Sequence, residues 1–196
     1  YEFFCNGPLS CDTTYPLTKP DRPVFINSER TGVHGIASVG CSVEDAHELL
    51  NTDTTDYATI TMAVGALSTG SISVKSAYQV YPQGSKTGFA VRDMNTILQA
   101  DVFESITVCT YLDDVVRECK SGGDLLDVSL LSNIIGSGSG VYNIGFRTSL
   151  SYDEVTIEVG SLLSALNIIR VYGAFVDTRG SFGNILDCCV TAPPSN

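Results

Sequence analysis

The hydrophobic positions of the chain alternate with polar ones over short stretches. Ile72 and Val74 alternate with Ser71, Ser73 and Lys75, and residues 154–159 alternate acidic or hydroxyl side chains with valine and isoleucine. This period of two predicts β-strands with one buried face. Residues 168–176 are apolar on both faces, which predicts a central strand. Further strands are expected at 57–64, 87–93, 105–112 and 142–146.

Clusters of Gly, Ser, Asp and Asn separate the predicted strands at intervals of about ten residues, a rhythm typical of all-β domains. We therefore predict an antiparallel β-sandwich or jelly roll over residues 32–177. Residues 1–31 contain four prolines and are expected to be irregular, with a short or edge strand at 24–26. Residues 178–196 are expected to form a tail. Two leucine-rich stretches are predicted as a helical turn or a buried connection: 125–131 and 161–166.

Seven cysteines are a high count for 196 residues. They lack the CxxC or Cys/His spacing of metal sites, so disulfides in an oxidising compartment are the better interpretation. Cys109 and Cys119 flank a predicted turn at Asp113–Asp114 and are candidates to face each other across a hairpin. Cys5 and Cys11 would close a small loop that pins the N-terminal segment. The other three cysteines are Cys41, Cys188 and Cys189.

Spacing leaves the remaining pairings open. One candidate joins Cys41 to either Cys188 or Cys189, near the C-terminus. Because seven is odd, one thiol stays free or bonds another chain. The termini of the domain are therefore predicted to be irregular but pinned by disulfides, and the protein is predicted to be extracellular or at the cell surface.

The acidic balance of the chain limits its partners. The formal net charge is −11 and the isoelectric point about 4.4, which argues against nucleic acid and against anionic membrane surfaces. No apolar run is long enough for membrane insertion. The hydrophobic fraction of 43% is sufficient for a folded core. The sequence begins at Tyr1 without Met or a signal peptide, so we expect a processed form or an excised piece.

No catalytic constellation is visible. Residues 136–140 read Gly-Ser-Gly-Ser-Gly, which matches a nucleophile elbow in letters but lacks the strand-turn-helix setting. His34 and His47 lie in no triad pattern. Acidic pairs such as Asp113–Asp114 are chain neighbours, and neighbours on a strand point to opposite faces, unlike the converging carboxylates of glycosidases. We expect no enzyme activity.

Four motifs occur in a suggestive order: GCSV at 40–43, LLDVSLL at 125–131, YDEV at 152–155 and RVYGAFV at 170–176. Together they resemble a module that is repeated in large secreted surface proteins of Bacteroidota. The resemblance covers about residues 32–177. It implies an extracellular, non-catalytic structural or adhesion module, such as a repeating subunit of a surface fibre. Its partners would be other protein modules or copies of itself.

A second stretch resembles the discoidin-like, galactose-binding sandwich. Asn51, Thr52 and Asp53 stand where that fold carries an Asp-Gly-Asn loop, and Asp56 and Tyr57 follow. This resemblance implies calcium held by Asn51, Asp53 and Asp56, and a ligand contact by Tyr57. Thr52 replaces the glycine of the tight turn, so a simple polar turn is the alternative.

The second functional hypothesis is therefore a calcium-assisted carbohydrate-binding module whose partner is a surface glycan. Sugar binding commonly uses an exposed aromatic ring, and the chain has no Trp. Besides Tyr57, the candidate platforms are Tyr78, Tyr81 and Tyr111, each of which is alternatively a half-buried strand residue.

Overall fold

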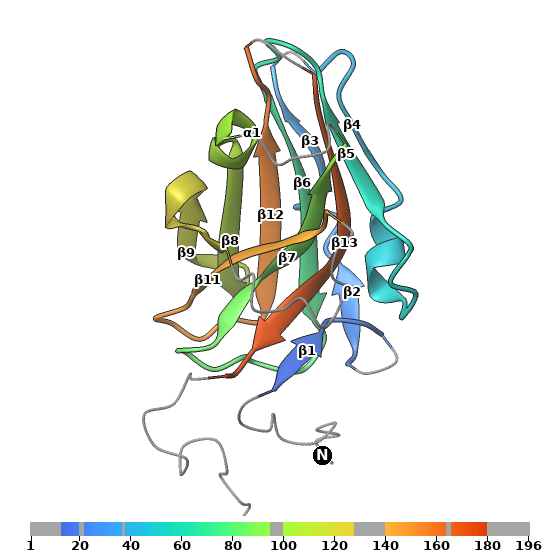
Figure 1. Ribbon diagram of the computed structural model, residues 1–196. Helices are drawn as coiled ribbons and strands as arrows, with labels where there is room; N and C mark the ends of the chain where they lie inside the picture. The colour runs from blue at the N-terminus through green and yellow to red at the C-terminus, as the bar shows by residue number, and fades with distance from the viewer. Residues whose placement is uncertain are drawn as a thin grey trace, which may run out of the picture.

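The protein forms two antiparallel sheets that pack face to face, as the computed structural model shows (Figure 1). The structure describes residues 13–19, 22–36, 38–94, 100–127, 140–163 and 166–179. The predicted antiparallel β-sandwich is confirmed.

The strands of the seven-stranded sheet are β1 (Thr14–Pro16), β4 (Ser42–Glu44), β5 (Ala58–Met62), β7 (Lys86–Asp93), β10 (Leu126–Asp127), β11 (Tyr142–Arg147) and β13 (Asn167–Asp177). Those of the six-stranded sheet are β2 (Val24–Ile26), β3 (Gly32–Gly35), β6 (Ser68–Ser76), β8 (Ile106–Leu112), β9 (Val115–Ser121) and β12 (Glu154–Gly160). The described residues also form three short helices: η1 (Ala46–Leu50), α1 (Ala100–Glu104) and η2 (Gly122–Asp124).

Hydrogen-bonded neighbours run β10-β11-β7-β13-β5-β4 in the first sheet, where β1 also pairs with β13. The second sheet runs β2-β6-β12-β8-β9, with β3 also paired to β6. β13 is the longest strand and pairs with both β5 and β7, as expected for the predicted central strand. Of the thirteen strands among the described residues, β1 and β2 lie in the N-terminal segment: β2 is the predicted short edge strand at 24–26, and β1 was not predicted.

The core lies between the sheets and is built by the alternation seen in the sequence. On β6 and β12, Ile72, Ile157 and Val159 are fully buried, and on β13 Ile169 and Val171 face them from the other sheet. Burying a side chain of this kind stabilises the fold by about 1.5–3 kcal/mol. The two faces that point away from this core are therefore available for function.

The hairpin β8–β9 carries the predicted disulfide. Cys109 is bonded to Cys119, and the two residues are direct cross-strand partners. Asp113 and Asp114 both have positive φ, 50° and 65°, as a two-residue type I′ turn requires. The hairpin and its disulfide are therefore confirmed.

The remaining cysteines are placed only in part. Cys41 forms no disulfide with any described residue, and its Sγ accepts a hydrogen bond from the Ala63 N–H at 3.3 Å. Its candidate partners, Cys188 and Cys189, lie outside the described residues, as do Cys5 and Cys11. These pairings stay predictions.

Both ends of the described chain lie at the same end of the sandwich, which we call the base (Figure 1). Thr14 of β1 pairs with Asp177 of β13, and the Thr178 N–H donates to the Thr13 carbonyl at 2.9 Å. The loops β3–β4, β5–β6 and β12–β13 lie at the opposite end. Within the described residues, no helix is long and apolar enough to span a membrane.

Candidate functional site

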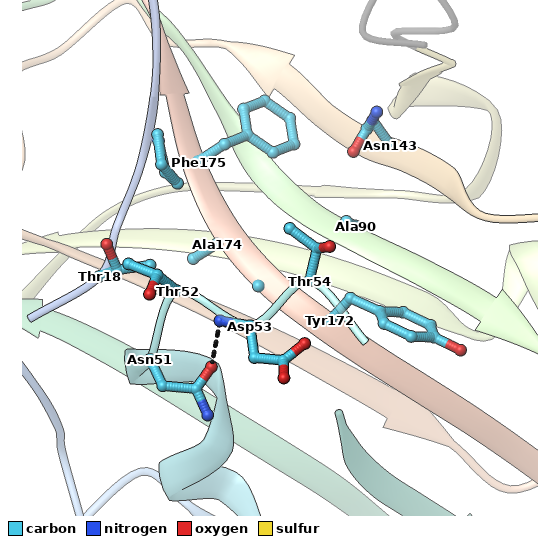
Figure 2. Close-up of a pocket in the computed structure, with 12 residues that line it drawn as sticks. Thr18, Asn51, Thr52, Asp53, Thr54, Ala90, Asn143, Tyr172, Ala174 and Phe175 are labelled. Carbon is cyan, nitrogen blue, oxygen red and sulfur yellow. Dashed lines mark hydrogen bonds between the residues drawn. The ribbon is translucent and has the colours of Figure 1, made fainter. Parts of the chain in front are cut away.

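A cleft of about 280 Å³ opens on the outer face of the seven-stranded sheet. Its floor comes from three neighbouring strands, with Asn143 on β11, Ala90 on β7 and Gly173 on β13. The loop 51–54 lies across β13 between Phe175 and Tyr172, and Figure 2 shows these side chains around the cleft. Pro16, the last residue of β1, and Thr18, two residues later, also line the cleft. The volume is just below the usual range for ligand pockets, about 300–1,000 Å³.

A β-bulge presents the aromatic wall of the cleft. The pairing of β13 with β7 shifts register between Val171 and Gly173, so Tyr172 has no direct partner on β7. Val171 points into the core and is fully buried, whereas Tyr172 is half-buried and lines the cleft. Bulges re-aim side chains in this way and are frequent beside binding sites.

Tyr172 is supported from behind by a stack of two further side chains. The Tyr57 and Tyr172 ring centroids are 5.6 Å apart at an interplanar angle of 55°. The Arg170 guanidinium lies 4.1 Å from the Tyr57 ring centroid, at cation–π distance. The predicted ligand residue Tyr57 therefore contacts Tyr172 but does not itself line the cleft, whereas Tyr172 and Phe175 do.

The loop 51–56 is held by hydrogen bonds among its own side chains. The Asn51 amide Nδ2 donates to the Glu48 and Asp56 carboxylates, at 2.8 Å each. Asn51 Oδ1 accepts from the Asp53 N–H at 2.8 Å, an Asx-turn contact that Figure 2 marks with a dashed line. These contacts fix the loop over the sheet.

This arrangement does not assemble an oxygen cage for calcium. The Asn51 side-chain N–H₂ donates to the Asp56 carboxylate, whereas in a calcium site the cation would face that carboxylate. Asp53 Oδ1 is engaged by the Thr55 N–H and hydroxyl. Within the described part of the chain, no group of three or more His, Cys, Asp and Glu side chains could hold a metal ion. Calcium at Asn51, Asp53 and Asp56 stays a prediction, and the loop geometry does not favour it.

Asp53 supplies a permanent negative charge beside the cleft. Its hydrogen bonds from the Thr55 hydroxyl and N–H lower the pKa of the carboxyl group below its usual value. Asp53 is therefore ionised at neutral pH and acts as a hydrogen-bond acceptor only.

Asn143 supplies a polar group at the floor. The residue is only 9% exposed, and its side chain makes no hydrogen bond to another described residue. Its amide nitrogen and oxygen are not fully shielded from solvent and open into the cleft. A bound water or ligand that reaches the cleft can satisfy them.

The other residues predicted as candidates are scattered. Tyr78 is 83% exposed, Tyr81 is buried against Tyr152, and Tyr111 lies beneath the Arg30 guanidinium, with none of them at the cleft. His34 and His47 are exposed and lie on different elements. The serines of the 136–140 motif lie outside the described residues.

A second cluster of charges lies on the outer face of the six-stranded sheet. Glu154 is fully buried and accepts hydrogen bonds from Ser73 at 2.5 Å, Asn27 at 2.8 Å and Arg30 at 3.2 Å. Lys75 Nζ lies 3.9 Å from the same carboxylate. Both oxygens of Glu154 are thus engaged by its own neighbours, so we interpret the cluster as structural.

Comparisons with known proteins give loose structural likenesses only. The sequence matches no protein-family model, and it matches no curated protein. Among solved structures, one similar chain is the family 32 carbohydrate-binding module of C. perfringens NanJ, solved in complex with galactose. It is 8% identical to this chain, and the alignment covers 83% of this chain and 99% of that one at a TM-score of 0.41. The xylan-binding module CBM86 of Roseburia intestinalis is 14% identical, with 79% and 92% covered at a TM-score of 0.39.

At such scores these likenesses assign neither a family nor a ligand to this chain. The resemblance to Bacteroidota surface modules finds no family match and stays a prediction.

Proposed function

We propose that this protein is an extracellular, non-catalytic carbohydrate-binding module that holds one sugar ring in the cleft over β7, β11 and β13. The observation that carries this proposal is the combination of an aromatic wall at Tyr172 with polar groups at the rim and floor. A pyranose ring has an apolar C–H face and a hydroxyl edge. The face stacks on an aromatic ring, and the edge binds acceptors and donors such as Asp53 and Asn143.

The distribution of carboxylates favours binding over hydrolysis. Asp53 is the one carboxylate among the described residues that line the cleft. Glycosidases of the common kinds require two, on opposite sides of the scissile bond. The disulfide between Cys109 and Cys119 supports an oxidising, extracellular setting.

The experiment exploits a glycine at the floor of the cleft. A Cβ added at Gly173 meets no atom within 4 Å, and the backbone there does not have positive φ, so Gly173→Leu fills the cleft without strain. Gly123→Leu is the matched control, since Gly123 is exposed on η2, also without positive φ. A glycan array identifies the ligand, and isothermal titration calorimetry then compares the variants.

We expect Gly173→Leu to abolish binding and Gly123→Leu to leave Kd unchanged. Tyr172→Ala should weaken binding by about 5- to 150-fold, because a stacked ring contributes about 1–3 kcal/mol with its apolar contact area. Tyr78→Ala, at an exposed tyrosine away from the cleft, is its control. A glycan that binds Gly173→Leu as tightly as the wild type would place the site elsewhere, and silence on the array would reject the proposal.

Calcium forms a separate arm of the same experiment. Because Asn51 Oδ1, Asp53 Oδ1 and Asp56 Oδ2 already accept hydrogen bonds within the loop, we expect EDTA to leave the glycan affinity unchanged. A large loss of affinity in EDTA, restored by calcium, would instead support the calcium-assisted form of the sequence hypothesis.

A further inference from the structure

The end of the sandwich opposite the base carries a cluster of exposed aliphatic side chains, which we call the distal loops. They lie on the β3–β4, β5–β6 and β12–β13 connections (Figure 1). The exposed fractions are 94% for Ile36, 93% for Val39, 55% for Val64, 71% for Leu67, 88% for Leu163 and 45% for Leu166. Scattered exposed apolar residues are ordinary, but a contiguous group on neighbouring loops marks an interaction surface.

The three distal loops are bonded to one another. The Ile36 N–H donates to the Leu67 carbonyl at 3.2 Å, which joins the first loop to the second. The Gly65 N–H donates to the Leu162 carbonyl at 2.7 Å, and the Ser161 hydroxyl to that of Ala66, which joins the second to the third. These bonds hold the described parts of the three loops next to one another, which lowers the cost of ordering them for a partner.

The sequence around these loops is free of charge. Residues 31–43, 57–74 and 159–169 contain no Asp, Glu, Lys or Arg, although the chain holds 22 acidic and 11 basic residues. A partner surface must accordingly be apolar and uncharged, since a charge buried against these side chains would lose its hydration without compensation.

We propose that the distal loops bind the distal loops of a second copy of this chain, as a two-fold symmetric, end-to-end contact. The chain itself supplies an apolar, uncharged surface of matching chemistry. Two copies that each carry a net charge of −11 repel one another, and a contact through uncharged loops brings no like charges together at its centre. Within the described chain, Thr14 and Asp177 lie at the base, at the end of the sandwich opposite the distal loops.

A lipid surface fits the same side chains less well. Membrane-contacting loops typically combine apolar tips with Lys or Arg for the phosphates and with Trp or Tyr at the headgroup level. The three runs contain no basic residue, the chain has no Trp, and the net charge repels anionic lipids.

The test measures self-association of the complete chain. A contact limited to three loops is at the small end of specific interfaces, about 1,200–2,000 Å² in total, so we expect a Kd of roughly 10–100 μM. Sedimentation velocity over a concentration series should show a monomer–dimer equilibrium. Added salt should strengthen it, because salt screens the net charge and leaves the apolar contact intact.

Leu163→Asp and Ile36→Asp should each raise Kd at least tenfold, since each places two charges in a symmetric contact. Both positions are almost fully exposed, so folding should be unaffected, which circular dichroism and the melting temperature verify. Val115→Asp is the matched control, because Val115 is 62% exposed on β9, away from these loops.

Three results would overturn the proposal. One is a wild type that stays monomeric up to about 1 mM. Another is a dimer that the two distal variants leave intact, which would place the contact on another face. The third is binding to phosphatidylcholine vesicles that Leu163→Asp abolishes while the protein alone stays monomeric, which would make the loops a lipid contact.

Discussion

The buried carboxylate of Glu154 gives a stability prediction that can be worked out from its contacts. Arg30 supplies its closest cation, 3.2 Å away, and the Arg30 side chain is 21% exposed, whereas that of Glu154 is fully buried. Arg30→Met removes the cation and keeps an apolar stem of similar length. Glu154 then remains buried with two neutral donors and with Lys75 at 3.9 Å.

The expected loss of stability depends on the groups that still contact the Glu154 carboxylate after the substitution. Removing one partner of a buried ion pair costs about 3–5 kcal/mol, because the other charge is left without compensation. Since Ser73, Asn27 and Lys75 remain, we expect the low end, about 3 kcal/mol. The lost cation–π contact of Arg30 with Tyr111, at 4.3 Å, adds about 0.5–1 kcal/mol.

Chemical denaturation with guanidinium chloride measures the free energy of unfolding of four proteins. These are the wild type, Arg30→Met, Glu154→Gln and the double variant. If the cost of Arg30→Met comes from an uncompensated charge, the double variant should be more stable than Arg30→Met alone, because the glutamine leaves no buried charge. An Arg30→Met variant within 1 kcal/mol of the wild type, or a double variant whose costs simply add, would refute this reasoning.

Three further predictions concern the hairpin, the acid limit and the cleft. Replacing Cys109 and Cys119 together by Ala should lower the melting temperature by roughly 4–12 °C in calorimetry, since a disulfide that closes a loop of this size contributes about 2–3 kcal/mol; an unchanged midpoint would contradict this. Hydrogen bonds from Lys75 and Arg30 lower the pKa of Asp114 in the folded protein. The ionised carboxylate therefore stabilises the fold above its unfolded-state pKa of about 3.9, and this stabilisation is lost as the pH falls through the folded-state pKa. Below about pH 4 the free energy of unfolding of the wild type should therefore approach that of Asp114→Asn. A difference between the two proteins that persists at pH 2 would show that the ionised carboxylate is not its source. Arg170→Met should weaken glycan binding about three- to tenfold by loosening the stack behind the aromatic wall, with the enthalpy of binding as the readout; an unchanged affinity would show that the stack is not needed.

The sequence predicted the strands well because the alternation reports burial directly. Ile72 and Val74 face the core as expected, and the Asp113–Asp114 turn fixed the pairing of Cys109 with Cys119. β1 could not be predicted, since its three residues depend on pairing with β13, more than 150 positions away along the chain.

The cleft was predicted only in its loop. Of the four residues predicted in the stretch 51–57, Asn51 and Asp53 line the cleft, whereas Asp56 and Tyr57 do not. Tyr172 was missed because residues 168–176 are apolar on both faces, and such a run hides the phase shift that a bulge introduces. Asn143 was missed because its burial depends on how distant segments lie over the outer face of the sheet, which local periodicity does not encode.

The pairing of β1 with β13 has a mechanical consequence. Because Thr14 lies opposite Asp177 at the base, tension applied to the two ends pulls the strands apart from that pair onward, so their hydrogen bonds break one after another and not all at once. Strands loaded in this unzipping geometry separate at low force. Pro16 and Thr18 belong to the wall of the cleft, so peeling β1 away removes that part of the wall. If the cleft binds a glycan as proposed, its affinity should fall under load before the sheets come apart.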